Sequence, residues 1–409
     1  MDVTGTFRFH NVGQGLFYSG KIVGPDGSEF NFVYDCGALS KGTSLKSNIE
    51  SNIEQYKKSL PDFKEKKILD LLIISHFHDD HVNGFVNLLD GNVEVRMAII
   101  PYYTEQLRQV ICLESTDPTL DDFNNDPVNW LLEHGVINLL LLGANDGGNN
   151  SNLNREGPAI TMDMENISGL NPSGGTTDIP ENSLAIYYKQ GSHVLWQFYF
   201  ENLKLKAPQK VDEYITMLKS ALKGKPLTDF IQNGVLINPL PSEVRKIFKS
   251  GSLINRTSVM VLHGPESFIS CSAQCACRCL HENYTKCPIN NNKANCACFV
   301  GSFFPVKCHG ITFLTGDIEL YLHSRVKLLN ILGTIDCPHR CFVLQYPHHG
   351  APTKALPRFV SLNARFNVIS YGTKNSYGHP SKRGFFTLPN NLVCVHEENA
   401  FEYTINVMM

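Results

Sequence analysis

The chain has 409 residues, of which 42% are hydrophobic and 18% charged, and its formal net charge at pH 7 is −3. That length exceeds a typical domain of ~150 residues, so we expect one core fold with large insertions, or two domains. A chain without overall basicity would need a local basic patch to bind nucleic acid through phosphate contacts.

The first 143 residues alternate between predicted strands and helices. The opening stretch lacks the basic and apolar regions of a secretory signal, and two strand-like runs flank a Gly-Gln-Gly turn at residues 13–15. An apolar strand then ends at Asp35, and apolar positions three or four residues apart predict a helix over 47–60. The continuous apolar run 67–76 predicts a strand buried on both faces. A short helix (82–90), a strand (95–101), a helix (129–135) and a strand (137–143) follow.

The middle of the chain has a different composition. Residues 144–182 are rich in Asn, Gly, Ser and Thr, which predicts a long exposed loop. Residues 183–200 predict a hairpin, and the helix-like segment 208–250 is more basic. We assign 1–143 to the N-terminal half of a core, 144–254 to a loop and helical insertion, and 255–409 to the C-terminal half.

The C-terminal part returns to strands. Residues 257–264 and 309–317 predict two paired strands, with a Cys-rich insertion over 265–309 between them. Further strands are predicted within 341–350, 366–372, 391–397 and 400–407. Strands at both ends of the chain around helical segments predict an α/β fold, a four-layer αββα sandwich with two facing sheets, outer helices and large insertions. The apolar runs are about half the ~20 residues of a membrane span, so we expect a cytoplasmic protein without one.

The densest cluster of chemically reactive side chains follows the predicted buried strand, in the stretch HFHDDH over residues 76–81. His76 and His78 alternate, so in an extended segment they point the same way. Imidazoles and carboxylates suit Zn²⁺, Mn²⁺ or Fe²⁺, and two cations can bind both the attacking and the leaving oxygen of a hydrolysis. We therefore predict metal binding here, rather than a chance cluster of histidines.

Two later segments could join the same site. Asp317 ends one predicted strand, and His348 and His349 end another. Alone, each could be an ordinary turn residue or a surface histidine pair. Together, at strand ends, they favour a shared metal centre.

The order of the motifs VYDCG, SHFHDDH, FLTGD, YPHHG and SYGHP resembles that of the metallo-β-lactamase superfamily. It is most similar to the hydrolase domain of competence DNA-uptake channels (ComEC-type), which shares the early turn at residues 12–15 and a late YGHP motif. The resemblance covers nearly the whole chain, with insertions. It implies phosphodiester hydrolysis in which two metal ions activate water.

The resemblance implies a role for each matching residue. Six would bind two divalent ions, zinc or manganese: His76 and His78 the first, Asp80, His81 and His349 the second, with Asp317 bridging them. His348 would face the substrate, although the sequence leaves open which of this histidine pair binds metal. Asp35 would orient a ligand histidine, and His379, in the same motif as Asn375, would lie near the leaving group. The residues implied to be catalytic are Asp80, His348 and His379.

The chain departs from the family pattern in two places. Where many members have another ligand histidine, Asn255 or Ser258 stands instead, so the first metal would bind more weakly or keep a water. His263 is near but at the far end of its strand. Leu16 replaces the acidic residue that usually follows the early glycine turn.

Eight cysteines in the insertion could bind metal: Cys271, Cys275, Cys277, Cys279, Cys287, Cys296, Cys298 and Cys308. Structural zinc takes four nitrogen or sulfur ligands, so with His281 and His309 this segment could hold one or two zinc ions. Disulfides and a disordered loop are the alternatives. The spacings match no common zinc finger, so no ligand set is assigned.

These features predict a metal-dependent phosphodiester hydrolase. A nuclease acting on DNA or RNA is the leading hypothesis, and a role as effector in a bacterial defence or conflict system rests on analogy. The lack of overall basicity favours a small phosphodiester somewhat, and a subunit that works mainly through a protein partner bound by the insertions is a further alternative. Lys374, Lys382 and Arg383 beside His379 are the one local indication of a basic groove at the site, with an ordinary solvated loop as the alternative.

Overall fold

The computed structural model describes the chain in segments. These are residues 2–39, 43–143, 160–163, 174–179, 182–203, 208–223, 225, 229–232, 235–236, 240–250, 254–266, 273–280, 306–319, 326–335, 340–351, 359, 361–376, 378–380 and 392–408.

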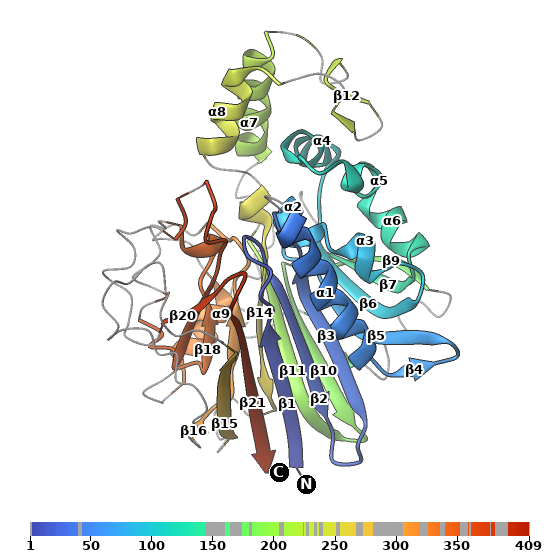
Figure 1. Cartoon of the computed structure of the whole chain (residues 1–409), viewed down its shortest axis with the longest axis vertical. Coiled ribbons are helices and arrows are strands. Elements are labelled where there is room, and N and C mark those ends of the chain that lie inside the picture. The colour runs from blue at the N-terminus through green and yellow to red at the C-terminus, as the bar shows by residue number, and fades with distance from the viewer. Residues whose placement is uncertain are drawn as a thin grey trace.

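Two large sheets form the centre of the molecule (Figure 1). In the described segments the first sheet has the order β16 (Val306–Cys308), β15 (Ala273–Leu280), β21 (Ala400–Met408), β1 (Asp2–Phe9), β2 (Phe17–Val23), β3 (Glu29–Cys36), β5 (Lys66–Ile73), β6 (Val93–Pro101), β7 (Val136–Leu142) and β9 (Gly175–Ile179), and β4 (Asp62–Phe63) pairs with β5. The second has the order β20 (Leu392–Val395), β19 (Phe366–Ser370), β18 (Val343–Gln345), β17 (Thr312–Leu314), β14 (Val259–Pro265), β11 (His193–Asn202), β10 (Ser183–Gln190) and β8 (Ile160–Asp163). A small separate sheet pairs β12 (Ile231–Gln232) with β13 (Val235–Leu236).

Helices cover the outer faces of the two sheets. The described α-helices are α1 (Thr43–Ser59), α2 (Asp79–Val82), α3 (Phe85–Leu88), α4 (Glu105–Glu114), α5 (Asp121–Asn125), α6 (Pro127–Glu133), α7 (Pro208–Ala221), α8 (Ser242–Ser250) and α9 (Lys327–Gly333). Short 3₁₀ turns occur at η1 (Pro118–Leu120), η4 (Ile254–Thr257) and η5 (His348–Gly350). No helix in these segments is long and apolar enough to cross a membrane.

Three apolar clusters define the layers. One lies between the two sheets and contains large aromatic side chains such as Phe32 and Trp196. A second joins α1 and α3–α6 to the outer face of the first sheet, and a third joins α9 to the outer face of the second. Neighbouring residues of β14 alternate between these layers, with Val261 in the inner cluster and Leu262 in the outer one. The order helix, sheet, sheet, helix confirms the predicted four-layer α/β fold.

Strands from the two ends of the chain meet in the first sheet. β1 pairs antiparallel with both β2 and β21, so residues 2–9 lie between strands from opposite ends of the sequence. Figure 1 accordingly shows both termini side by side, at the end of the sheets opposite α2.

The segment 144–254 contributes more to the sheets than its composition indicates. The predicted hairpin is confirmed, since β10 pairs antiparallel with β11 in the second sheet. Within the stretch predicted as a long loop, residues 160–163 and 175–179 form β8 and β9, which pair with β10 and β7. The Thr and Ile residues of GTTDI favour a strand locally, but the Asn-, Gly- and Ser-rich composition around them predicted a loop.

The Cys-rich insertion also reaches a sheet. β14 pairs with β17, as predicted for the two strands that flank it. Between them the chain crosses to the other sheet, where β15 pairs with β21 and β16 pairs with β15. The register places Cys275, Cys277 and Cys279 opposite Ile405, Tyr403 and Phe401.

Candidate metal centre

The site lies where strands of both sheets end. Asp35 is near the end of β3, His76 follows β5, Asp317 follows β17, His349 follows β18, and Ser370 ends β19. β3 and β5 are parallel, and so are β17, β18 and β19, so the carboxyl ends of each set meet at the same edge. Two groups of residues far apart in the sequence are thus brought face to face.

The backbone of the HFHDDH loop packs closely against two glycines. A Cβ atom on Gly15 would lie 2.7 Å from the carbonyl oxygen of Asp80, and one on Gly37 would lie 2.6 Å from the carbonyl carbon of His81. The Leu16 backbone N–H donates to the same Asp80 oxygen at 3.0 Å. Only glycine permits such close approach of backbones, which explains why the early glycine turn belongs to the site.

The protonation of His76 and His78 can be assigned from their partners. The Ser75 hydroxyl donates to Asp35 Oδ2 at 2.6 Å, so it must accept from His76 Nδ1 at 2.8 Å. His78 Nε2 lies 2.9 Å from the Glu114 carboxylate, which can only accept, so this nitrogen carries the proton. In the neutral imidazoles His76 Nε2 and His78 Nδ1 therefore both present lone pairs, 3.1 Å apart.

His81 and His349 are fixed in the same way. His81 Nδ1 donates to Asp35 Oδ2 at 2.8 Å, and His349 Nδ1 donates to the Ser370 carbonyl oxygen at 2.7 Å. Their Nε2 atoms face carboxylates: His81 faces Asp317 Oδ1 at 3.2 Å, and His349 faces Asp80 Oδ2 at 3.1 Å. In the neutral imidazoles these Nε2 atoms are lone pairs directed at other acceptors.

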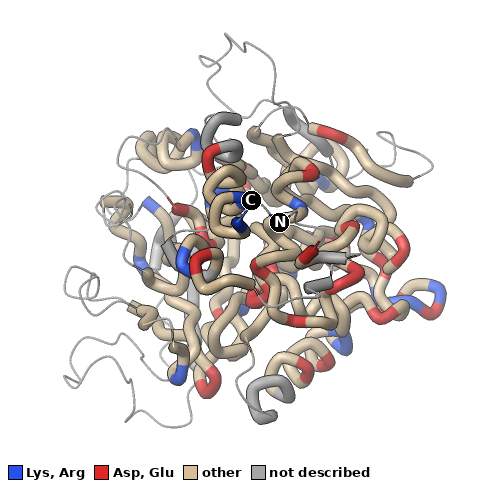
Figure 2. Tube along the Cα trace, turned by 90° about the horizontal axis from the view of Figure 1, so that it is seen from above, with Lys and Arg blue, Asp and Glu red and all other residues tan. Residues whose placement is uncertain are grey.

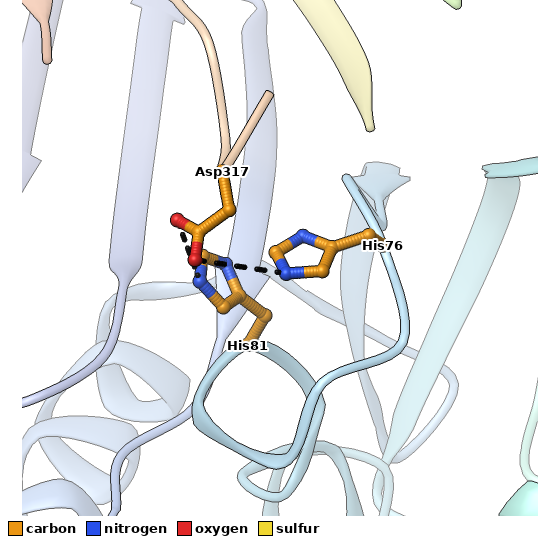
Figure 3. A group of neighbouring side chains, drawn as sticks. All are labelled: His76, His81 and Asp317. Atoms are coloured by element: carbon orange, nitrogen blue, oxygen red, sulfur yellow. Dashed lines mark ion pairs between the residues drawn. The ribbon is translucent and has the colours of Figure 1, made fainter. Parts of the chain in front are cut away.

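Such a cluster of acceptors fits divalent cations. His76, His81 and Asp317 offer one ligand atom each within 4.8 Å of one another (Figure 3). Asp80, His81 and His349 form a second such group. His81 Nε2 and Asp317 Oδ1 are buried and have no hydrogen bond among the described residues. Buried polar atoms are rarely left unpaired, and imidazole with carboxylate is a ligand set that suits zinc and manganese.

Without a cation, the acceptors would have to share protons. Burial opposes protonation of His81, yet the carboxylates of Asp317 and Asp35 raise its pKa well above the usual value. Burial, together with the nearby His81, lowers the pKa of His76 well below it. The two pKa values move in opposite directions because the carboxylates favour positive charge on His81, while burial and repulsion from His81 oppose a second charge on His76.

His348 and His379 lie beside the cluster. Their ring centroids are 5.1 Å apart, and His348 Nε2 is 3.9 Å from Asp317 Oδ2. Burial, then the charge of His348, lowers the pKa of His379 to about 4, so it is neutral near pH 7. Asn375 fixes this loop, because its side-chain oxygen accepts from the His379 backbone N–H at 3.2 Å. His349, not His348, is the one of the pair that closes against Asp80.

The residues at the expected third-histidine position are also buried. Asn255 lies in η4 and Ser258 directly follows it, and Asn255 Oδ1 and Ser258 Oγ have no hydrogen bond among the described residues. The next residue, Val259, donates its backbone N–H to the Ser75 carbonyl oxygen at 2.8 Å, beside His76. His263 lies elsewhere: it is buried between the sheets, where Tyr18 Oη is 2.9 Å from its Nε2. Leu16 is buried in the inner apolar cluster.

Three side chains near the site were not anticipated from the sequence. Glu114 ends α4 and accepts from His78, and Tyr214 of α7 donates its hydroxyl to Glu114 Oε1 at 3.1 Å. Asp79, left out of the expected ligand set, accepts from the Thr116 backbone N–H at 2.7 Å. Nothing local in the sequence marks Glu114 or Tyr214, because their partners come from other elements.

The remaining expectations concern residues outside the described part or without described side chains. Cys271, Cys287, Cys296 and Cys298 lie outside the described residues, as do Lys382 and Arg383. Cys275, Cys277, Cys279 and Cys308 are described only as backbone positions of β15 and β16. In the view of Figure 2, basic and acidic positions of the described residues are interspersed along the trace.

No model of a known protein family matches the chain, and no curated protein matches it in sequence. Among solved structures, it is similar to a crystal structure of a long form RNase Z from yeast, with 9% sequence identity and a TM-score of 0.32 over 97% of this chain and 41% of that chain. It is also similar to the metallo-β-lactamase MIM-1 from Novosphingobium pentaromativorans, with 9% identity and a TM-score of 0.24 over 93% and 88% of the two chains. The chain thus spans less than half the length of the RNase Z chain. The residues of the site itself carry the functional proposal.

Proposed function

We propose that the chain is a metal-dependent hydrolase that cleaves phosphodiesters. The observation that carries the proposal is the convergence of four histidine lone pairs and two carboxylates in one buried site, with each opposite imidazole nitrogen already hydrogen-bonded. The first ion would be held by His76 Nε2 and His78 Nδ1, the second by Asp80, His81 and His349, with Asp317 between them. When bound, the ions supply Lewis acidity that lowers the pKa of water and offsets charge on a phosphoryl oxygen.

The chain's own residues would orient the reaction. Asp35 holds Ser75 and His81 in place, and through Ser75 it fixes His76. His348 and His379 are not needed to complete either metal group, and they lie next to each other at the site. A neutral imidazole can donate one hydrogen bond, so this pair would bind the phosphate or a leaving oxygen.

We propose a nuclease acting on DNA or RNA as the first substrate class, following the motif resemblance. A small phosphodiester is the second candidate, because the net charge is −3 and basic and acidic positions are interspersed along the trace in Figure 2. A cytoplasmic location, a role as effector in a defence system and zinc in the Cys-rich insertion accompany this proposal. A subunit that works mainly through a protein partner bound by the insertions is a further alternative.

The decisive experiment is a substrate screen with matched variants. Metal-loaded wild type is incubated with single- and double-stranded DNA, RNA and a chromogenic aryl phosphodiester, next to Asp80→Ala and His81→Ala. We expect turnover by the wild type and loss of it in both variants. The accompanying readout is bound zinc or manganese, which should be lower in the two variants than in the wild type. A wild type that retains no divalent metal and hydrolyses none of these substrates would contradict the proposal.

A further inference from the structure

We propose that Glu114 is a positioning residue for the first metal, and that Tyr214 links it to the insertion helix α7. This inference deepens the proposed function and rests on it. It concerns side chains that the motif pattern does not mark. It also assigns a role at the metal centre to part of the 144–254 insertion.

The contact between Glu114 and His78 determines which imidazole nitrogen of His78 is available to bind metal. Glu114 Oε2 lies 2.9 Å from His78 Nε2, and the Glu114 side chain is only 7% exposed. Because a carboxylate accepts only, it keeps the proton of His78 on Nε2 and leaves the lone pair on Nδ1. That lone pair faces His76 Nε2 at 3.1 Å, where the first metal would bind. Without Glu114, the proton could occupy either nitrogen and the ring could turn away.

The backbone around Glu114 is tied to the same loop. Asp79, the residue after His78, accepts from the Ser115 hydroxyl at 2.7 Å and from the Thr116 backbone N–H at 2.7 Å. The end of α4 is therefore joined to the HFHDDH loop by two independent sets of hydrogen bonds. This double attachment holds the Glu114 carboxylate at a fixed distance from the imidazole.

Tyr214 connects this attachment to α7. Its hydroxyl donates to Glu114 Oε1 at 3.1 Å, so the two carboxylate oxygens have different partners, His78 on one side and Tyr214 on the other. Tyr214 is itself buried, in the cluster that contains the α4 residue Leu107. Figure 1 shows α7 and α8 at the end of the sheets where α2 lies. A shift of α7 would thus change the orientation of the His78 imidazole through the Glu114 carboxylate.

The test measures Co²⁺ affinity by calorimetric titration of the metal-free full chain. We expect Glu114→Ala to weaken one binding event about 10- to 100-fold, the range for loss of a residue that orients a metal ligand. Binding by the group Asp80, His81 and His349 should be unchanged. Glu114→Gln keeps an acceptor for the His78 proton, so it should restore most of the affinity. Glu133→Gln, at the exposed last residue of α6, is the matched control and should bind as wild type does.

Tyr214→Phe tests the link to α7. Removing one hydroxyl should weaken the same binding event about two- to tenfold. In a Glu114→Ala background the same change should have no further effect, because Tyr214 acts through Glu114. An equal effect in both backgrounds would overturn the link.

The outcomes separate the inference from the function on which it rests. If wild type shows no Co²⁺ binding that Asp317→Asn abolishes, the proposed function itself fails. If wild type binds and Glu114→Ala binds with unchanged affinities, the function stands and the positioning role is wrong. Should Glu114→Ala not fold by circular dichroism, a Glu114→Gln variant with the full loss expected of alanine would also contradict the hydrogen-bonding role.

Discussion

His81 Nε2 and Asp317 Oδ1 face each other at 3.2 Å, both buried, and they are not aligned for a hydrogen bond. The opposite nitrogen of His81 is already bonded to Asp35. Two acceptors held this way repel each other unless a cation or an extra proton lies between them. The stability of the fold should therefore depend on what occupies the site.

We expect divalent metal to stabilise the folded chain. A ligand that binds only the native state at 100 times its Kd adds about 2.7 kcal/mol to the free energy of unfolding. Denaturant titration of chelator-treated wild type, with and without added zinc or manganese, measures the gain. Asp317→Asn should gain much less, which separates this site from any metal held by the Cys-rich insertion. Equal gains in the two proteins would contradict the site.

Asp35→Asn should weaken metal binding although Asp35 binds no metal itself. The Asp35 carboxylate accepts from the Ser75 backbone N–H at 2.6 Å, from the Ser75 hydroxyl and from His81. An amide lacks the charge and presents a donor where an acceptor is needed, so we expect about a 10- to 100-fold loss of affinity. Metal titration checks this, with exposed Asp62→Asn as the control. Unchanged affinity would mean that the histidine orientation does not depend on this carboxylate.

His263 should make stability fall in acid. Burial lowers the pKa of His263 from 6.5 to about 3, so the unfolded chain takes up a proton that the native chain does not. This group does not lower the free energy of unfolding above about pH 6.5. As the pH falls from there towards about 3, it lowers that free energy by about 1.4 kcal/mol per pH unit. Denaturant titrations at several pH values give the free energy of unfolding as a function of pH. This free energy should fall less steeply with decreasing pH for His263→Gln than for the wild type. An unchanged slope would show that His263 is protonated in the fold.

Gly15→Ala should destabilise the fold and disturb the metal loop together. The added methyl would lie 2.7 Å from the Asp80 carbonyl oxygen, and overpacking of this kind costs about 1–3 kcal/mol. Thermal or denaturant unfolding gives the cost. Gly333→Ala is the matched control, because nothing lies within 4 Å of the added atom there. Equal stability of the two variants would show that the turn can move away.

Local patterns predicted the layers and the ligand loop because each has a short-range signal. Apolar runs marked β5, β6 and β7, and the run of histidines and aspartates marked the loop after β5. Asp317 and His349 could be added since each ends an apolar strand. The geometry confirms that these segments converge, while the ligand roles themselves stay predictions.

Other features have no short-range signal. Glu114 is one acidic residue at the end of a helix, and only the fold places His78 next to it. β9 lies in a segment whose overall composition indicates a loop, and only the fold places it next to the edge strand β7. Even Asp79, within the ligand run, turns out to hold Ser115 and Thr116, a use that no spacing rule indicates.

The pairing of β1 with β21 also limits how far the chain can fold while it is being synthesised. On the ribosome, residues 76–81 emerge long before Asp317 and His349, and β1 has an open edge until residues 400–408 arrive. Until then the N-terminal half has one open strand edge and only part of the proposed metal centre, a state prone to wrong pairing. The proposed metal centre can form only after Asp317 and His349 have been synthesised, so the order of the chain delays its assembly.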